Sequence, residues 1–82
     1  MKVKIPGYSS LTGSPETILR LMSEARWYDH LQGNDLIDDI IHTVWRAFGV
    51  GLQVTGDTYA ERAESLLREL NKANMIEIEE ES

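Results

Sequence analysis

Four side chains that could bind a metal ion or transfer a proton fall at helical spacing in the middle of the sequence. They are Asp35, Asp38, Asp39 and His42. Carboxylates and an imidazole three and four residues apart can hold a divalent cation on one helix face. Acids in the first turn of a helix also favour its positive dipole end, and His42 can pair with Asp38 or Asp39 in solvent. We therefore expect no metal site and interpret the four residues as an acidic surface that a partner could bind.

Aromatic residues flank this acidic run on both sides. Trp27 and Tyr28 precede it, and Trp45 falls beside Asp38 at the margin of the same helical face. Tryptophan and tyrosine are common anchors of protein interfaces, so these three residues are candidates for partner binding. The alternative is that they close the core beneath the loop of residues 29–34, because a small domain needs its large side chains inside.

The sequence carries no recognisable catalytic motif. There is no cysteine, and no serine has a motif that places a base beside it. Gly49 and Gly51 lack the Lys-Ser/Thr of a phosphate loop. Glu61 and Glu64 are similar to the paired acids with which helical nucleotide pyrophosphatases hold magnesium, but helix capping already explains Glu61. We expect neither an enzyme nor a cofactor; a metal-dependent enzyme would need the acids to converge with groups from another element.

Charge excludes some classes of partner. The 82 residues include 8 basic and 14 acidic side chains, for a net charge of −6, and the basic residues are scattered along the chain. Direct binding to nucleic acid draws on a concentrated basic face, and an anionic membrane would repel such a chain, so both are disfavoured. A protein partner with a basic surface is expected. The lack of cysteine and of an apolar N-terminal stretch predicts a cytoplasmic protein.

Hydrophobic periodicity predicts six elements in the order β-α-α-β-α-β. The strands are expected at residues 2–5, 50–54 and 75–79, and the helices at residues 15–26, 34–48 and 58–73. The strands alternate apolar and polar residues, which is typical of a sheet with one buried face. We predict an α+β fold in which three helices pack on one face of a small three-stranded sheet. The chain is expected to form a single domain, residues 1–82, with an acidic tail at residues 79–82 that frays.

Local signals mark the helix ends. Ser14 followed by Pro15 predicts the start of the first helix, and Asn34 or Asp35 is the expected cap of the second. Gly49 is the expected C-terminal glycine of that second helix. Thr58-Tyr59-Ala60-Glu61 fits a capping box at the start of the third.

Two apolar stripes are expected to supply most of the core. One lies on the second helix and the other on the third. Their residues are Leu36, Ile37, Ile40, Ile41, Val44 and Phe48, and then Ala60, Ala63, Leu66, Leu67 and Leu70.

Two resemblances bear on function. Residues 66–78 resemble the helix-to-wing passage of winged-helix regulators, although the exposed face of this helix carries three glutamates beside two basic residues. In size, charge and lack of cysteine, the whole chain is similar to small acidic accessory proteins of phages and mobile elements, including anti-CRISPR inhibitors. That resemblance implies an inhibitor that occupies a basic site on a nucleic-acid-binding host protein. The alternatives are a transcriptional regulator and a structural subunit that buries its aromatics against its own copies, as a homodimer would.

Overall fold

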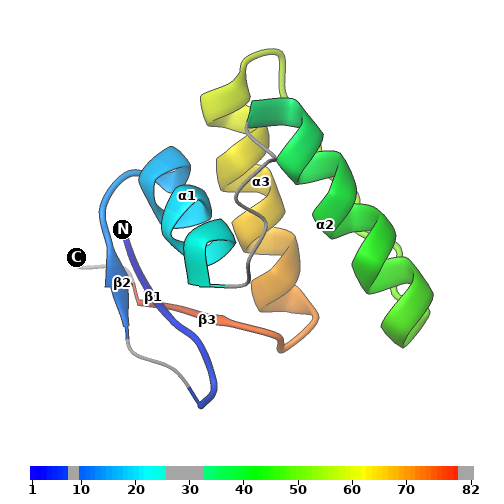
Figure 1. Cartoon of the computed structure of the whole chain (residues 1–82), viewed down its shortest axis with the longest axis horizontal. Helices are drawn as coiled ribbons and strands as arrows, with labels where there is room; N and C mark the ends of the chain where they lie inside the picture. The colour runs from blue at the N-terminus through cyan, green and yellow to red at the C-terminus, as the bar shows by residue number, and fades with distance from the viewer. Residues whose placement is uncertain (8–9, 26–32, 80–82) are drawn as a thin grey trace.

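The structure is a computed structural model that describes residues 1–7, 10–25 and 33–79. Three strands and three helices follow one another in the order β-β-α-α-α-β (Figure 1). The elements are β1 (Lys2–Lys4), β2 (Leu11–Thr12), α1 (Pro15–Ala25), α2 (Gly33–Phe48), α3 (Tyr59–Lys72) and β3 (Glu77–Glu79). The α+β class and the three-stranded sheet are therefore confirmed.

The strands form one antiparallel sheet in which β1 lies between β2 and β3. Val3 is the central residue: it pairs with Leu11 on one side and with Ile78 on the other. Pairing of the first and last strands agrees with the alternating pattern of the two segments. Glu79 belongs to β3, pairs with Lys2, and places its carboxylate 3.6 Å from the Lys2 ammonium. The expectation that the frayed tail begins at Glu79 is therefore wrong, and residues 80–82 lie outside the described residues.

The sheet does not contain the strand expected at residues 50–54. Its place is taken by β2, which lies in a Ser-, Thr- and Gly-rich stretch that we expected to be a loop. Two residues are too few to show an alternating pattern, so only the pairing with β1 identifies this strand. The Gly13 amide donates to the Met1 carbonyl at 3.0 Å, which extends the pairing of β1 and β2 by one residue pair.

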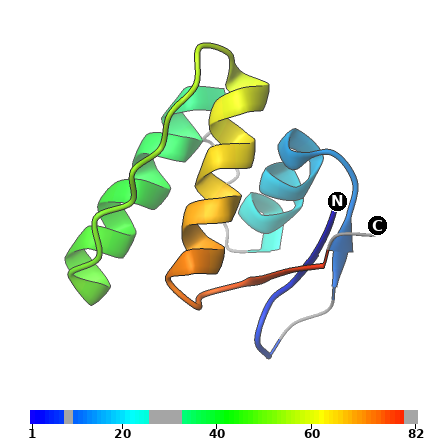
Figure 2. The same ribbon diagram turned by 180° about the vertical axis from the view of Figure 1, so that it is seen from behind.

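The three helices do not all pack on the sheet. α1 contacts β2, α3 contacts β3, and α3 also lies against both other helices. Figures 1 and 2 show α2 on the side of α3 that is farther from the sheet. The expected arrangement of three helices on one sheet face is thus correct for α1 and α3 but not for α2.

The core follows from these contacts. Its fully or nearly buried side chains come from all three helices, β1, and residues 52 and 76. They are Val3, Ile18, Leu19, Leu36, Ile37, Val44, Leu52, Ala63, Leu66, Leu67, Leu70 and Ile76. Two residues of the expected apolar stripes are instead exposed: Ala60, in the first turn of α3, and Phe48, at the end of α2.

Helix ends follow the local signals in most cases. The Thr17 amide donates to Ser14 Oγ at 3.3 Å, so Ser14 caps α1 as expected. Gly49 has a φ of 69°, and its amide donates to the Trp45 carbonyl, which closes α2. The expected cap of α2 is wrong, because the helix begins at Gly33 and already includes Asn34 and Asp35.

The capping box at the start of α3 is complete, and it supports a prediction. The Glu61 amide donates to Thr58 Oγ1 at 3.2 Å, and the Thr58 amide donates to Glu61 Oε1 at 3.1 Å. Thr58→Ala is expected to lower the free energy of unfolding by about 1 kcal/mol, because one end of this reciprocal pair is lost. Thr55→Ala is the control: it removes an exposed hydroxyl that forms no hydrogen bond with the described residues, and should change the value by less than about 0.5 kcal/mol. Urea denaturation measures both; equal effects would contradict the capping role.

Candidate partner-binding surface

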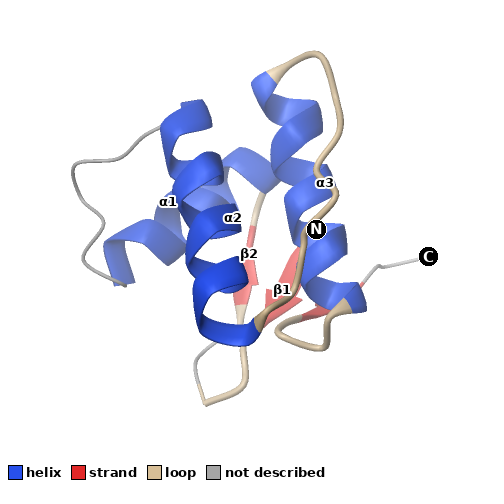
Figure 3. Ribbon diagram, turned by 90° about the vertical axis from the view of Figure 1, so that its right-hand side faces the viewer, coloured by secondary structure: helices blue, strands red, loops and turns tan. Residues whose placement is uncertain are grey.

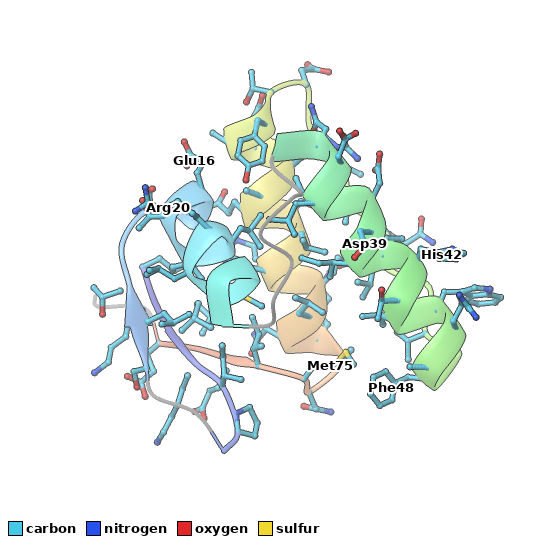
Figure 4. The ribbon with its side chains drawn as sticks, viewed as in Figure 1. Glu16, Arg20, Asp39, His42, Phe48 and Met75 are labelled. Carbon is cyan, nitrogen blue, oxygen red and sulfur yellow. The ribbon has the colours of Figure 1, made fainter. Side chains whose placement is uncertain are left out.

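The predicted acidic residues of α2 do not form one continuous charged face. Asp35 and Asp38 are exposed, whereas Asp39 is half-buried. Among the described residues, the buried Asp39 Oδ2 has no hydrogen-bond partner. Figure 4 shows His42 pointing away from the rest of the molecule and Asp39 on the side of α2 nearer the other helices. The expectation that all the acids of α2 project outward is therefore wrong for Asp39.

Asp38 is also engaged within the protein. Its Oδ1 accepts a hydrogen bond from Arg62 Nη2 of α3 at 3.1 Å, and Asn34 Oδ1 accepts from Arg62 Nη1 at 2.6 Å. The Asp38 side chain remains 65 % exposed, so the ion pair is largely solvated and contributes only up to about 1 kcal/mol. Arg62 partly neutralises the N-terminal half of the acidic helix and ties α2 to α3. No sequence motif indicates this contact, because its partners lie 24 and 28 residues apart.

The C-terminal half of α2 exposes two large aromatic side chains. Trp45 is 58 % exposed and Phe48 is 65 % exposed. Figures 1 and 2 show the reason: α2 diverges from α3 towards its C-terminal end, so none of the described helices packs against its last turn. Phe48 points towards Met75 in the view of Figure 4 but is not covered by it. The prediction that Phe48 belongs to the core is wrong, and so is the alternative in which Trp45 closes the core.

Trp45 and Phe48 share one face of α2 with the residues that Arg62 binds. Asn34, Asp38, Trp45 and Phe48 are separated by four, seven and three residues, which keeps them on one side of a helix. We call this the aromatic face and define it by these four residues and Ile41, which falls between Asp38 and Trp45. It combines a mildly acidic end with an apolar end.

Residues 50–57 take the place of the expected second strand, and we call this segment the strap. Its apolar residues do alternate inward, since Leu52 is buried and Val54 is half-buried. The strap packs on helices rather than in a sheet: the Gln53 amide donates to Glu69 Oε1, and the Thr55 amide donates to Ser65 Oγ, both at 3.0 Å. The alternation of apolar residues correctly predicted that one side of this segment is buried, but it could not show that the segment packs on a helix rather than beside a strand.

The spacing of these two hydrogen bonds shows how the strap lies on α3. The bonded amides are two residues apart, about 6.7 Å in an extended chain. Their acceptors are four residues apart in α3, about 6.0 Å along a helix. The strap therefore runs antiparallel to α3, which agrees with Figures 2 and 3. The signal that could have revealed it is the pair Ser65 and Glu69, two polar residues one turn apart beside the buried stripe of α3.

The strap and the aromatic face lie on the same side of the molecule. Arg62, Ser65 and Glu69 are separated by three and four residues, so they share one face of α3. Two of them hold the strap, and the third reaches Asn34 and Asp38 on α2. One surface therefore carries the strap, the Arg62 contacts and the aromatic residues.

A shallow hollow of about 590 Å³ lies between the strap and the outer side of α3. Its wall is polar and of mixed charge, with Glu64 within 3.5 Å of Arg68 and Glu69 within 3.1 Å of Lys72. These ion pairs also occupy the basic residues of α3, which a DNA-recognition helix would need for phosphates.

Glu69 is the titratable group with the clearest role in this region. The hydrogen bond from the Gln53 amide lowers the pKa of the Glu69 carboxyl below its usual 4.5, and Lys72 lowers it further. A carboxyl whose pKa is lower in the folded state stabilises the fold above the unfolded pKa. That stabilisation is lost as pH falls through the folded pKa.

Glu69→Gln is therefore expected to flatten the acid end of the stability profile. The glutamine keeps an oxygen that can accept from Gln53 but does not titrate, so the variant should lose less stability than the wild type between about pH 7 and about pH 3. Glu64→Gln, at the more exposed Arg68 pair, is the matched control and should retain the wild-type slope. Urea denaturation across this pH range compares the three proteins; identical slopes for the wild type and Glu69→Gln would contradict the assignment.

Tyr59 is the other perturbed group. Burial raises the pKa of its phenol above 10.0, and the negative charge of Glu16 raises it further. Figure 4 shows Glu16 and Arg20 on the outer side of α1. The phenol is therefore protonated at neutral pH, which makes it unsuitable as a nucleophile or base.

No three His, Cys, Asp or Glu side chains of residues 1–7, 10–25 and 33–79 come together as metal ligands. No helix within those ranges is both long and apolar enough to cross a membrane. Trp27 and Tyr28, two of the predicted aromatic anchors, lie outside the described residues.

Comparison with known proteins gives no relative: no protein family, curated protein or solved structure matches the chain significantly.

Proposed function

We propose that the protein is a small interaction module that binds a partner protein through the aromatic face of α2. The observation that carries this proposal is the exposure of Trp45 and Phe48, 58 % and 65 %, on adjacent turns of one helix. Exposed aromatic side chains that cluster in this way are the usual anchors of protein interfaces. Asp38 lies on the same face about two turns towards the N-terminus of α2 and adds a polar edge.

Charge defines the partner further. With a net charge of −6, the protein attracts a basic surface and repels an acidic one. The partner that fits combines an apolar pocket for Trp45 and Phe48 with basic residues around it. Such surfaces occur on nucleic-acid-binding proteins, and the narrower form of the proposal is an inhibitor that occupies one. Small acidic accessory proteins of phages and mobile elements act in this way, and the cytoplasm is the compartment for such a role.

The aromatic face, rather than the run of acids alone, is the centre of this proposal. Arg62 already holds Asp38, and Asp39 is half-buried, so little of the acidic helix remains to imitate a phosphate backbone. The acids then act mainly on the rate of association, while the aromatics supply the affinity.

Affinity capture from nuclease-treated host lysate tests the proposal. The baits are the wild type, the double variant Trp45→Ala/Phe48→Ala, and Glu77→Gln as a control on β3, far along the chain from α2. We expect one basic protein to be captured by the wild type and the control but not by the double variant, and less of it at high salt. Equal capture by all three baits would place the binding surface elsewhere. If the double variant differs only in losing self-association, the aromatics serve a structural assembly instead.

A further inference from the structure

One edge of the strap has backbone amides that are hydrogen-bonded within the protein, and the opposite edge has backbone amides that are not. In an extended chain, successive residues direct their amide and carbonyl groups to opposite edges. Gln53 and Thr55 donate to α3, so Leu52 and Val54 direct their amides to the other edge. No residue in the described part of the chain accepts a hydrogen bond from either of these two amides. The strap therefore presents half of a β-ladder.

The sequence of the strap suits a strand. Val50, Leu52 and Val54 alternate with smaller or polar residues, which is the pattern that predicts β-structure. In the described structure this segment has no strand beside it, although its side chains and one edge are already arranged as in a sheet. An unpaired edge with such a sequence is a template for a strand from another chain.

The surroundings of the free edge indicate what chemistry the added strand would carry. The spacing of α2 and the contacts of Arg62 put Trp45 and Phe48 on the same side of the molecule as the strap, with Asp38 on the same face of α2. Apolar side chains of an added strand would meet the aromatics, and basic ones would meet the carboxylates. A second copy of this chain is a poor occupant, because each copy carries a net charge of −6 and the two would repel.

We infer that the free edge of the strap binds an extended, basic and apolar segment of the partner protein as an added β-strand. This inference rests on the proposed function and specifies how the partner engages the same surface. Main-chain hydrogen bonds to Leu52 and Val54 give the segment its register, and the aromatic face selects its alternate side chains.

The experiment begins with a displayed library of random ten-residue peptides selected on the immobilised wild-type protein. The tightest peptide is synthesised, and amide hydrogen exchange is followed by NMR with and without it. We expect exchange at Leu52 and Val54 to slow about tenfold or more, because each amide gains a hydrogen bond. Gln53 and Thr55 are already bonded and should change less.

Two N-methylated forms of the selected peptide provide a matched control. A strand uses alternate amides on each edge, so methylation of one set blocks pairing and methylation of the other does not. One form should lose about tenfold or more in affinity while the other binds as the parent. Equal binding by both forms would overturn strand addition.

The outcomes separate this inference from the proposed function. Peptides with helical spacing that perturb Trp45 and Phe48 but leave exchange at Leu52 and Val54 unchanged would overturn strand addition and support the aromatic face. A library that yields no binder up to about 1 mM would contradict both. Slowed exchange at Leu52 and Val54 that depends on protein concentration alone would identify a second copy as the occupant and overturn the stated partner.

Discussion

Leu67→Ala is expected to lower the free energy of unfolding by about 3 kcal/mol. Leu67 is fully buried on α3, the helix that contacts both other helices and β3. Truncation removes apolar atoms from the core and leaves a cavity, because the close-packed elements around α3 relax only partially into the vacated space. Urea denaturation at neutral pH measures the change, with an unaltered dependence on denaturant showing that the fold persists.

Phe48→Ala is the matched comparison for Leu67→Ala. Both residues were expected in the core, but Phe48 is 65 % exposed. Its replacement should change the free energy of unfolding by less than about 0.5 kcal/mol despite the loss of a larger side chain. If Phe48→Ala cost as much as Leu67→Ala, the end of α2 would be packed rather than exposed, and the aromatic face would lose its basis.

Gly56→Ala is expected to destabilise the protein by about 2 kcal/mol or more. Gly56 ends the extended part of the strap with a φ of 132°, a conformation that alanine rarely adopts. A Cβ there would lie 2.7 Å from Glu61 Cβ and 3.0 Å from the Arg62 amide nitrogen, both in the first turn of α3. The strap or the helix start would have to shift, and with it the capping box.

Gly51→Ala is the matched control within the same strap. Nothing lies within 4 Å of the Cβ that it adds, and the backbone of Gly51 is not in the left-handed region. The variant should be neutral or more stable by up to about 1 kcal/mol, because alanine restricts the unfolded chain. Similar losses for Gly51→Ala and Gly56→Ala would indicate that the strap does not lie on α3 as described.

The features that the sequence predicted well are those encoded locally. The Thr58 and Glu61 capping box and the Gly49 terminus depend on residues within one turn of each other. The stripe of α3 was also predictable, because a helix buried on one side repeats its apolar residues at helical spacing. Only Ala60 departs from it, in the first turn of the helix, where little of the chain covers it.

The errors arise where a residue's partner is distant in sequence. Alternation around Leu52 predicts a buried side but does not say whether a strand or a helix lies beside the backbone. The Ser65 and Glu69 side chains took the role of a neighbouring strand, and β2 took the place of the missing one. Phe48 is exposed because α2 diverges from α3. That divergence depends on the crossing angle of the two helices, which cannot be read from the apolar pattern of either helix alone.

The candidate site was predictable in part. Trp45 and Asp38 were identified as a potential binding surface, and both are exposed on one face of α2. The engagement of Asp38 by Arg62 and the half-burial of Asp39 required the tertiary structure. For these two reasons, the proposed interface centres on the aromatic side chains rather than on the acidic ones.

The most direct test of the central claim is the dissociation constant of the captured partner for the wild type and for Trp45→Ala. If the aromatic face anchors the complex, Trp45→Ala should weaken binding by roughly thirtyfold or more, which corresponds to about 2 kcal/mol. Glu77→Gln should stay within about twofold of the wild type, since a charge outside an interface acts only weakly at physiological salt. Unchanged affinity for Trp45→Ala would contradict the account and show that the partner binds another surface.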